Sequence, residues 1–532
     1  DAVVRRAITL WLAPPATRDD RVEFVFGRDP STITVPAVLA VLNRQRTDLL
    51  DGVFGKPLHG RFLKKGVRHI PLFDGHYYHW LPRQVTRYAD LLTDLAALPK
   101  ATMGERVGAV RRLGRLPGLG ADAVRPFLAD AEVAVVEAAL AALSWSDRPD
   151  QVFTELLGYA DTDRARVAMY AATRCARFIS PADLVAPLRA TLAGRKVSSR
   201  KEALRLVAEH RVPGAVDLLT ELWAQPDLHR DLRRAIVSAA RWLLDQPAAW
   251  DLLALAIPAG DAVAAALAEA GPYTVAAPHR ARYGALVRAV AAADDPHTAL
   301  LGLAAWPAWS PWDRDGADLL VARVVDLSTT ALWRAAAHAL ITATAANADL
   351  GPLRTVLNGL AVAREPIAPD RDRPAAQRIS HLADRLAAGV PANGESFRAA
   401  TETVALALAD HPDHRAEAIA LATAALPRHG ELYPTLHRIA GLADRPVLAW
   451  LAAQHARTWF ANQDPYRPGT LAAARRLATG TPAEALLAVA VTDATGTRTG
   501  WPQPWRELVH ELRQHTDPDV RHRARRTTTA PE

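Results

Sequence analysis

Residues 161–171 read DTDRARVAMYA, and residues 229–236 read HRDLRRAI. In both segments an arginine, Arg166 or Arg233, is followed three positions later by an apolar residue. Arg200 is followed at the same distance by an alanine, and the three arginines are 34 and 33 residues apart. A period of this length across helical segments predicts a stack of helical pairs instead of one globular core.

The helical pattern extends over residues 120–245. Two apolar stripes show it most clearly, one at Val133, Val136, Leu140 and Leu143, the other at Leu228, Leu232, Ile236, Ala239 and Leu243. Spacings of three and four residues place each stripe on one face of a helix, and neighbouring helices can bury it. The fold class predicted is therefore all-α, an α-solenoid of about twelve helical pairs, or α-α superhelix.

The composition supports burial and a reducing compartment. The chain has 532 residues, half of them apolar and only 6% aromatic. Its single cysteine, Cys175, excludes an internal disulfide and lies on an apolar face, so we interpret it as a core residue in a cytoplasmic protein. We find neither a secretory signal nor an uninterrupted apolar run of about 20 residues, which predicts no membrane contact. The chain begins with Asp1, so a fragment of a larger protein is one interpretation.

Positive charge is concentrated in the first half of the chain. The net charge is +7; residues 1–245 contain 36 basic and 28 acidic side chains, and the remainder contains 28 and 29. Only six of the basic residues are lysines. This modest excess permits an acidic partner but does not require one.

The first hundred residues differ from the repeats. The pattern predicts a helix over 2–12, a short strand over 21–26 (RVEFVF), a helix over 36–50 and another over 83–98. Between the last two lies an irregular segment, 51–82, which is rich in glycine and aromatic residues. A segment of this length is usually functional or disordered, but its rings predict that it is packed. We interpret residues 1–100 as an irregular N-terminal cap.

Residues 101–526 are predicted to form the repeat array. Three insertions rich in proline, glycine or polar residues, near 306–313, 364–378 and 492–504, are predicted to be loops at its edge. Residues 527–532 form a polar tail.

One segment resembles a known family. Residues 516–526, TDPDVRHRARR, resemble the opening of the second helix in HEAT repeats, and 161–171 and 229–236 are similar but more degenerate. Ala134 departs from the pattern, because it replaces the arginine. The resemblance implies a HEAT-repeat, armadillo-like solenoid whose second helices line a concave surface, and residues 1–100 resemble the terminal cap of actinobacterial proteins of this type. HEAT families are mostly scaffolds and adaptors; a minority bind nucleic acid, and a small DNA-glycosylase branch is enzymatic.

The repeated arginine is the first candidate for a binding site. It occurs as Arg166, Arg200, Arg233, Arg334 and Arg521. Its planar guanidinium group could bind phosphates or carboxylates of a partner. The alternative, which the resemblance favours, is that each arginine pairs with an aspartate in a turn, at Asp163, Asp227 or Asp519.

The irregular segment contains a second candidate. Its basic residues are Lys56, Arg61, Lys64, Lys65 and Arg68. Because phenylalanine and tyrosine lie between them, the segment could bind single-stranded nucleic acid, with charges on the backbone and rings on the bases. The interpretation we favour is a capping loop with buried rings and solvated charges. His76 and His79 could approach a metal ion, but a complete ligand set is lacking, so we predict neither metal nor cofactor.

Three tryptophans form the third candidate. Trp306, Trp309 and Trp312 are three residues apart and separated by prolines. If exposed, they would be aromatic anchors for a partner, but we favour burial.

Two segments resemble enzyme motifs but are incomplete. Residues 229–232 read HRDL, yet the asparagine of a kinase catalytic loop is missing. Residues 52–57 are too short for a phosphate-binding loop.

These observations predict a non-catalytic interaction or scaffold module that recognises a macromolecular partner along a solenoid surface. A protein is the expected partner. DNA or RNA is the alternative, and a glycosylase-like enzyme is a third hypothesis, which no acid, base or nucleophile in the sequence supports.

Overall fold

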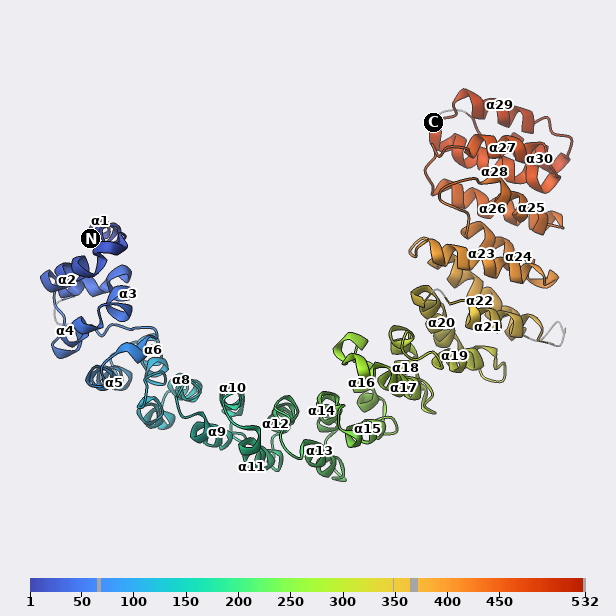
Figure 1. The fold of residues 1–532 in the computed structure, drawn as a ribbon. Helices are drawn as coiled ribbons and strands as arrows, with labels where there is room; N and C mark the ends of the chain where they lie inside the picture. Colours follow the sequence, from blue (N-terminus) through green and yellow to red (C-terminus); the bar gives the residue numbers. More distant parts are fainter. Residues whose placement is uncertain (65–67, 348, 364–371, 530–532) are drawn as a thin grey trace. The chain divides into compact units, whose positions relative to one another are not determined.

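A computed structural model describes residues 1–64, 68–347, 349–363 and 372–529, and within these ranges the regular elements are all helices. The contacts divide the chain into two compact units, residues 1–253 and 254–532 (Figure 1). The predicted all-α fold is confirmed. None of the described helices combines the length and apolarity needed to cross a bilayer. The boundary that we expected near residue 100 stays a prediction.

Unit 1 begins with a helical segment and continues as helical hairpins. Its α-helices are α1 (Ala2–Trp11), α2 (Arg18–Arg28), α3 (Pro36–Arg44), α4 (Leu50–Gly55), α5 (Pro82–Ala97), α6 (Met103–Leu113), α7 (Gly120–Val124), α8 (Val133–Leu143), α9 (Pro149–Leu157), α10 (Ala165–Ala176), α11 (Pro181–Leu192), α12 (Val197–Glu209), α13 (Ala215–Trp223), α14 (Arg230–Ala240) and α15 (Pro247–Ala254). Helices α9 and α10, α11 and α12, and α13 and α14 pack as pairs.

The even-numbered helices α6, α8, α10, α12 and α14 pack side by side in one row of unit 1 (Figure 1). Small side chains make this close packing feasible: in α10, Ala168, Ala172 and Cys175 are fully buried. Burial raises the pKa of the Cys175 thiol to about 12, as expected for a core residue. These contacts confirm the predicted solenoid of stacked helical pairs within this unit.

Two consecutive repeats of unit 1, α9–α10 and α11–α12, are joined by the turn aspartate Asp161. The carboxylate of Asp161 accepts hydrogen bonds from the backbone N–H of Arg195, at 3.0 Å, and of Lys196, at 2.9 Å. These bonds lower the pKa of Asp161, the Lys196 bond contributing most. Nearby, the Ser199 hydroxyl donates to the Ala160 carbonyl. The turn aspartate thus binds the backbone of the next repeat.

Unit 2 repeats the arrangement. Its α-helices are α16 (Asp261–Ala268), α17 (Arg280–Ala291), α18 (Pro296–Trp309), α19 (Gly316–Val325), α20 (Trp333–Asn347), α21 (Gly351–Ala361), α22 (Pro374–Gly389), α23 (Glu395–Ala409), α24 (Arg415–Ala424), α25 (Tyr433–Leu442), α26 (Pro446–Ala461), α27 (Thr470–Ala478), α28 (Pro482–Thr499), α29 (Gln503–Leu512) and α30 (Pro518–Arg526). The even-numbered helices from α16 to α30 pack successively in a row, and odd-numbered helices pack against them.

The predicted strand over 21–26 is wrong, because these residues belong to α2. An alternating pattern also fits a helix if two of its apolar residues are four positions apart, because such residues lie on the same helical face. Val22 and Phe26 have this spacing and are buried, whereas Phe24 is 66% exposed. Asp19 and Asp20 in the first turn stabilise the helix.

The predicted loop at 306–313 is also largely wrong. Helix α18 continues through Pro307 to Trp309, and only 310–313 leave the helix. The indole N–H of Trp306 donates to the Asp313 carboxylate at 2.9 Å, and the ring of Trp309 stacks on Tyr283 with centroids 4.9 Å apart. The favourable free energy of burying two large rings offsets the cost of the backbone hydrogen bond that Pro307 cannot donate.

The other two predicted insertions have different outcomes. Residues 364–371 lie outside the described residues, but α22 already begins at Pro374, so the end of the 364–378 insertion is helical. In the 492–504 insertion, α28 extends to Thr499. It ends at Gly500, whose φ of 73° is the left-handed conformation that glycine adopts at helix ends. Threonine and glycine content misled the prediction, since Thr492, Thr495 and Gly496 are buried inside α28.

Candidate functional site

The aromatic residues of the 51–82 segment form a core. Phe54, Phe73, Tyr77 and Trp80 are buried around Tyr88 of α5, with ring centroids 5.1–6.1 Å apart. The Tyr88 hydroxyl donates to the Pro71 carbonyl, and burial raises the pKa of Tyr88. The prediction of a packed segment is confirmed.

The basic residues of the same segment lie on its surface, apart from the buried rings. Lys56, Arg61, Lys64 and Arg68 are exposed, and Lys65 lies outside the described residues. Arg61 pairs with Asp1 at 2.9 Å and Arg68 with Asp94 at 3.5 Å. The rings that a nucleic-acid site would need for stacking are therefore mostly in the core. Among the described residues, no group of three or more His, Cys, Asp or Glu side chains is arranged to hold a metal ion.

The repeated arginines do not form the aspartate pairs that we considered. Arg200 donates to the Gln225 side-chain carbonyl at 3.1 Å, and Arg233 lies 5.0 Å from the Trp223 ring. Arg334 covers the Trp333 ring at 4.6 Å, and Arg521 donates to the His515 carbonyl at 2.6 Å. Arg166 is exposed and has no ion pair within the described part of the chain. Most of these arginines therefore have local partners, and their role in ligand binding stays a prediction.

The burial that we favoured for the tryptophan cluster is confirmed for two of its three rings, which removes them as anchor candidates. Trp306 and Trp309 are 2% and 0% exposed, so neither ring can contact a partner. Trp312 is half-buried and lies at the edge of this core, 5.9 Å from the Tyr273 ring. Trp306 and Trp309 therefore fill the interior where α18 ends, and Trp312 borders it.

Three other aromatic rings, which we did not predict as a site, are exposed at one repeated position of unit 1. Trp145, Phe178 and Trp242 each lie two residues beyond the last residue of an even-numbered helix: α8, α10 and α14. They are 47%, 73% and 60% exposed. Because we aligned the repeats on the first residues of their second helices, we missed a pattern that is visible at the ends of these helices. We call these three residues the aromatic ladder.

The aromatic ladder continues the solvent-facing stripes of its helices. Residues four positions apart share one face of a helix, so Arg166, Tyr170 and Arg174 form one stripe on α10, and Tyr170 is 69% exposed. We call the corresponding solvent-facing stripes of α6, α8, α10, α12 and α14, together with the aromatic ladder, the row face of unit 1.

Trp145 is held between two arginines of neighbouring repeats. Arg115, just after α6, lies 4.4 Å from the centroid of the indole ring, and Arg174 of α10 lies 3.7 Å from it. Such cation–π contacts stabilise the ring orientation by about 0.5–1 kcal/mol each at exposed sites. A hollow of about 250 Å³ adjoins the ring and is lined by Arg111 and Arg115.

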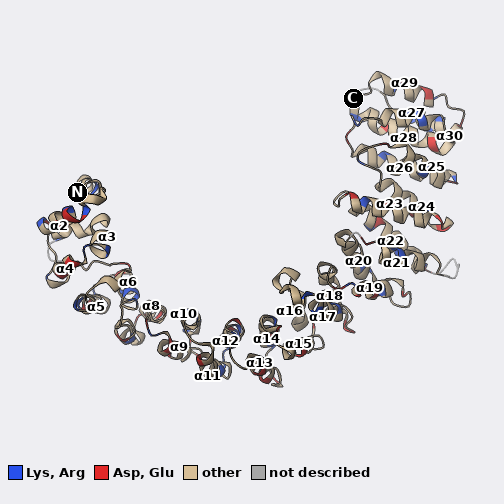
Figure 2. Ribbon diagram, in the orientation of Figure 1, with Lys and Arg blue, Asp and Glu red and all other residues tan. Residues whose placement is uncertain are grey.

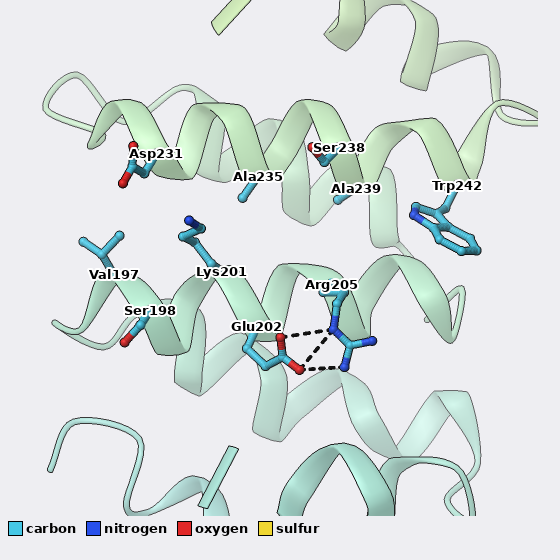
Figure 3. Close-up of a pocket in the computed structure, with 10 residues that line it drawn as sticks. All are labelled: Val197, Ser198, Lys201, Glu202, Arg205, Asp231, Ala235, Ser238, Ala239 and Trp242. Carbon is cyan, nitrogen blue, oxygen red and sulfur yellow. Dashed lines mark hydrogen bonds and ion pairs between the residues drawn. The ribbon is translucent and has the colours of Figure 1, made fainter. Parts of the chain in front are cut away.

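A second hollow, of about 650 Å³, lies between α12 and α14 (Figure 3). Val197 and Asp231 lie at one end of it, Trp242 at the other, and small side chains including Ala235 line the middle. Lys201 extends from α12 into the space between the two helices. The hollow therefore offers an apolar floor with an indole ring at one end and charged side chains along its sides.

Acidic side chains on the row face are largely engaged by arginines of the same chain. Glu202 receives hydrogen bonds from Arg205, the shortest at 2.6 Å (Figure 3). It also accepts one from the Thr173 hydroxyl. Burial by itself raises the pKa of Glu202, but these bonds outweigh it, and the pKa is lowered. Arg205 also pairs with Glu209, and Glu137 faces Arg164 at 3.7 Å. Basic and acidic residues thus occur on the same helices (Figure 2). Ion pairs with arginines neutralise most of these carboxylates.

Comparison with known proteins adds little to the functional assignment. No family model matches the sequence, and no curated protein matches it. A chain of the structure described as "A conserved phosphorylation switch controls the interaction between cadherin and beta-catenin in vitro and in vivo" has 14% identity and a TM-score of 0.24; the match covers 82% of this chain and 98% of that one. For "Molecular features of the UNC-45 chaperone critical for binding and folding muscle myosin" the identity is 13%, the TM-score 0.24 and the coverage 85% of this chain but only 64% of that one. At these TM-scores neither similarity assigns a function.

Proposed function

We propose that the protein is a non-catalytic interaction module whose row face in unit 1 binds an extended segment of a partner protein. The observation that carries this proposal is the aromatic ladder: three large rings are exposed at the same repeated position. Scattered exposed rings are common on proteins, but a regular series along one face is typical of binding surfaces. Trp145, Phe178 and Trp242 would be its anchors.

The geometry favours an extended ligand. Each repeat contributes one helix to the row, so a segment that crosses successive helices meets one ring or hollow per step. The hollows at Trp145 and Trp242 are each bordered by an indole ring, and an indole provides a large apolar contact with a polar N–H. Binding would therefore be the sum of several moderate contacts, with the rings contributing most.

The nucleic-acid alternative from the sequence receives less support. The buried rings of the 51–82 segment weaken the case for nucleic acid there, and we do not propose a reaction, a cofactor or a metal for this surface. A cytoplasmic location remains part of the proposal, because the sole cysteine, Cys175, is a buried thiol.

The proposal is tested by selecting a phage library of random 12-residue peptides on the full chain and measuring the selected peptides by fluorescence anisotropy. The test variant is Trp145→Ala/Phe178→Ala/Trp242→Ala. Truncation of a central ring costs about 2 kcal/mol, which corresponds to about 30-fold in Kd, so the triple variant should lose measurable binding.

The matched control is Tyr78→Ala/Tyr466→Ala, since these rings are 80% and 75% exposed but belong to elements outside the row face. It should bind the peptides as the natural chain does. Equal binding by the triple variant and the natural chain, or a library that yields no binder, would refute the proposed surface.

A further inference from the structure

Most of the positive charges of the row face lack a carboxylate partner among the described residues. Its cations are Arg111, Arg115, Arg166, Arg174, Lys201 and Arg205, and its carboxylates are Glu137, Glu202, Glu209 and Asp231. Within the described part of the chain, Arg205 alone among these six cations has a carboxylate within 4.0 Å. Three of the four carboxylates are already engaged by an arginine. The charge left for a ligand is therefore positive.

The cations are densest around Trp145. Arg115, just after α6, and Arg174 of α10 approach the indole ring from the two neighbouring repeats. Arg111 and Arg115 line the adjoining hollow. The Nε atom of Arg115 is buried and has no hydrogen-bond partner among the described residues. The ring offsets only part of the repulsion between these like charges, so an anion placed beside them would be favourable.

The pattern of charge favours carboxylate side chains over a nucleic-acid backbone. A phosphodiester chain carries one negative charge at every nucleotide and cannot avoid Glu137 and Glu209, which are interspersed with the cations. A peptide can place its acidic residues opposite the cations alone and leave neutral residues opposite the carboxylates. Guanidinium groups bind carboxylate and phosphate oxygens alike, so the discrimination rests on the spacing of the charges.

We propose that the segment bound by the row face is acidic, with Asp or Glu side chains that pair with the arginines around Trp145 and with Lys201. This inference rests on the proposed function and adds the chemistry of the partner. Trp145 follows α8 and Lys201 lies on α12, two helices further along the row. Packed helices are about 8–10 Å apart, and an extended chain rises about 3.3 Å per residue, so the two acidic positions should be about five or six residues apart.

The 12-residue library selected on the full chain tests this chemistry directly. The selected peptides should be enriched in Asp and Glu at two positions with that separation. Arg174→Glu and Lys201→Glu should each weaken binding about tenfold, and raising sodium chloride from 50 to 300 mM should weaken it by a similar factor. Arg6→Glu, an exposed charge reversal on α1, is the matched control and should change Kd less than twofold.

The outcomes separate this inference from the proposed function. Peptides that are neutral or basic, yet lose binding in the Trp145→Ala/Phe178→Ala/Trp242→Ala variant, would overturn the inference and leave the function standing. Absence of any binder would overturn both. A 12-nucleotide oligothymidylate that binds at least as tightly as the selected peptides and displaces them would also overturn the inference, in favour of a nucleic-acid partner.

Discussion

Replacement of one buried arginine in unit 2 should be unusually costly. Arg378 of α22 is 2% exposed. Its guanidinium group donates to the carbonyls of Val324 and Asp326, both at 2.8 Å, and of Thr329 at 2.5 Å. The side chain also lies 5.1 Å from the Trp333 ring. It therefore satisfies three carbonyl groups at and beyond the end of α19.

The cost of Arg378→Ala follows from those three bonds. Hydrogen bonds to charged groups contribute about 1.5–3 kcal/mol each, but burial of the charge offsets part of this, as the lowered pKa of Arg378 indicates. Removal of the side chain leaves three carbonyl oxygens without a donor and opens a cavity. We expect unit 2 to lose about 3–5 kcal/mol of unfolding free energy.

The assay is urea unfolding of the full chain, followed by circular dichroism at 222 nm. Arg385→Ala is the matched control, since Arg385 lies on the same helix and is exposed, and its one hydrogen bond among the described residues is to His338 Nδ1, at 3.1 Å. It should cost less than about 1 kcal/mol. Equal midpoints for Arg378→Ala and Arg385→Ala would refute the reasoning.

Three further predictions concern single positions. The Cys175 thiol, whose pKa burial raises to about 12, should react with iodoacetamide in the unfolded chain but not in the native chain at pH 8; rapid native labelling would contradict its burial. Asp161→Asn should destabilise unit 1 by less than about 1 kcal/mol at pH 7, because the group is exposed. Since hydrogen bonds lower the folded-state pKa of Asp161, its contribution is present above its unfolded pKa and lost as pH falls through the lowered value, so thermal melts of the two proteins should converge in acid. Gly500→Ala should lower the unfolding free energy by about 1 kcal/mol in thermal melts, because the φ of 73° is unfavourable for alanine. A methyl group meets no atom at Gly500 or at Gly441, so Gly441→Ala inside α25 is the control and should be neutral or stabilising.

The fold was predictable because helical periodicity is a local property of the sequence. Arg166, Arg200 and Arg233 mark equivalent positions, and the apolar stripes between them fix the buried faces. Glycine, proline and threonine were misread as loop residues in α18 and α28 because their effect depends on tertiary packing. Gly496 shows this. A Cβ at this position would come within 2.5 Å of the Trp501 ring, so the absence of a side chain lets the indole of Trp501 pack against α28.

The candidate surface was harder to predict than the fold. The sequence shows which residues are aromatic or basic, but exposure depends on which side of a helix meets its neighbours. Trp306 and Trp309 are buried, whereas Trp145 and Trp242 are exposed, and composition alone does not separate them. Comparison of the residues just beyond each second helix would have found the exposed series.

The central claim is that the row face of unit 1 binds a partner segment. Hydroxyl-radical footprinting with mass spectrometry, in the presence and absence of a peptide selected on the full chain, measures this at Trp145, Phe178 and Trp242 individually. We expect oxidation of all three rings to fall on binding while that of Tyr466 in unit 2 stays constant. Unchanged oxidation of the three rings in the saturated complex would contradict the account.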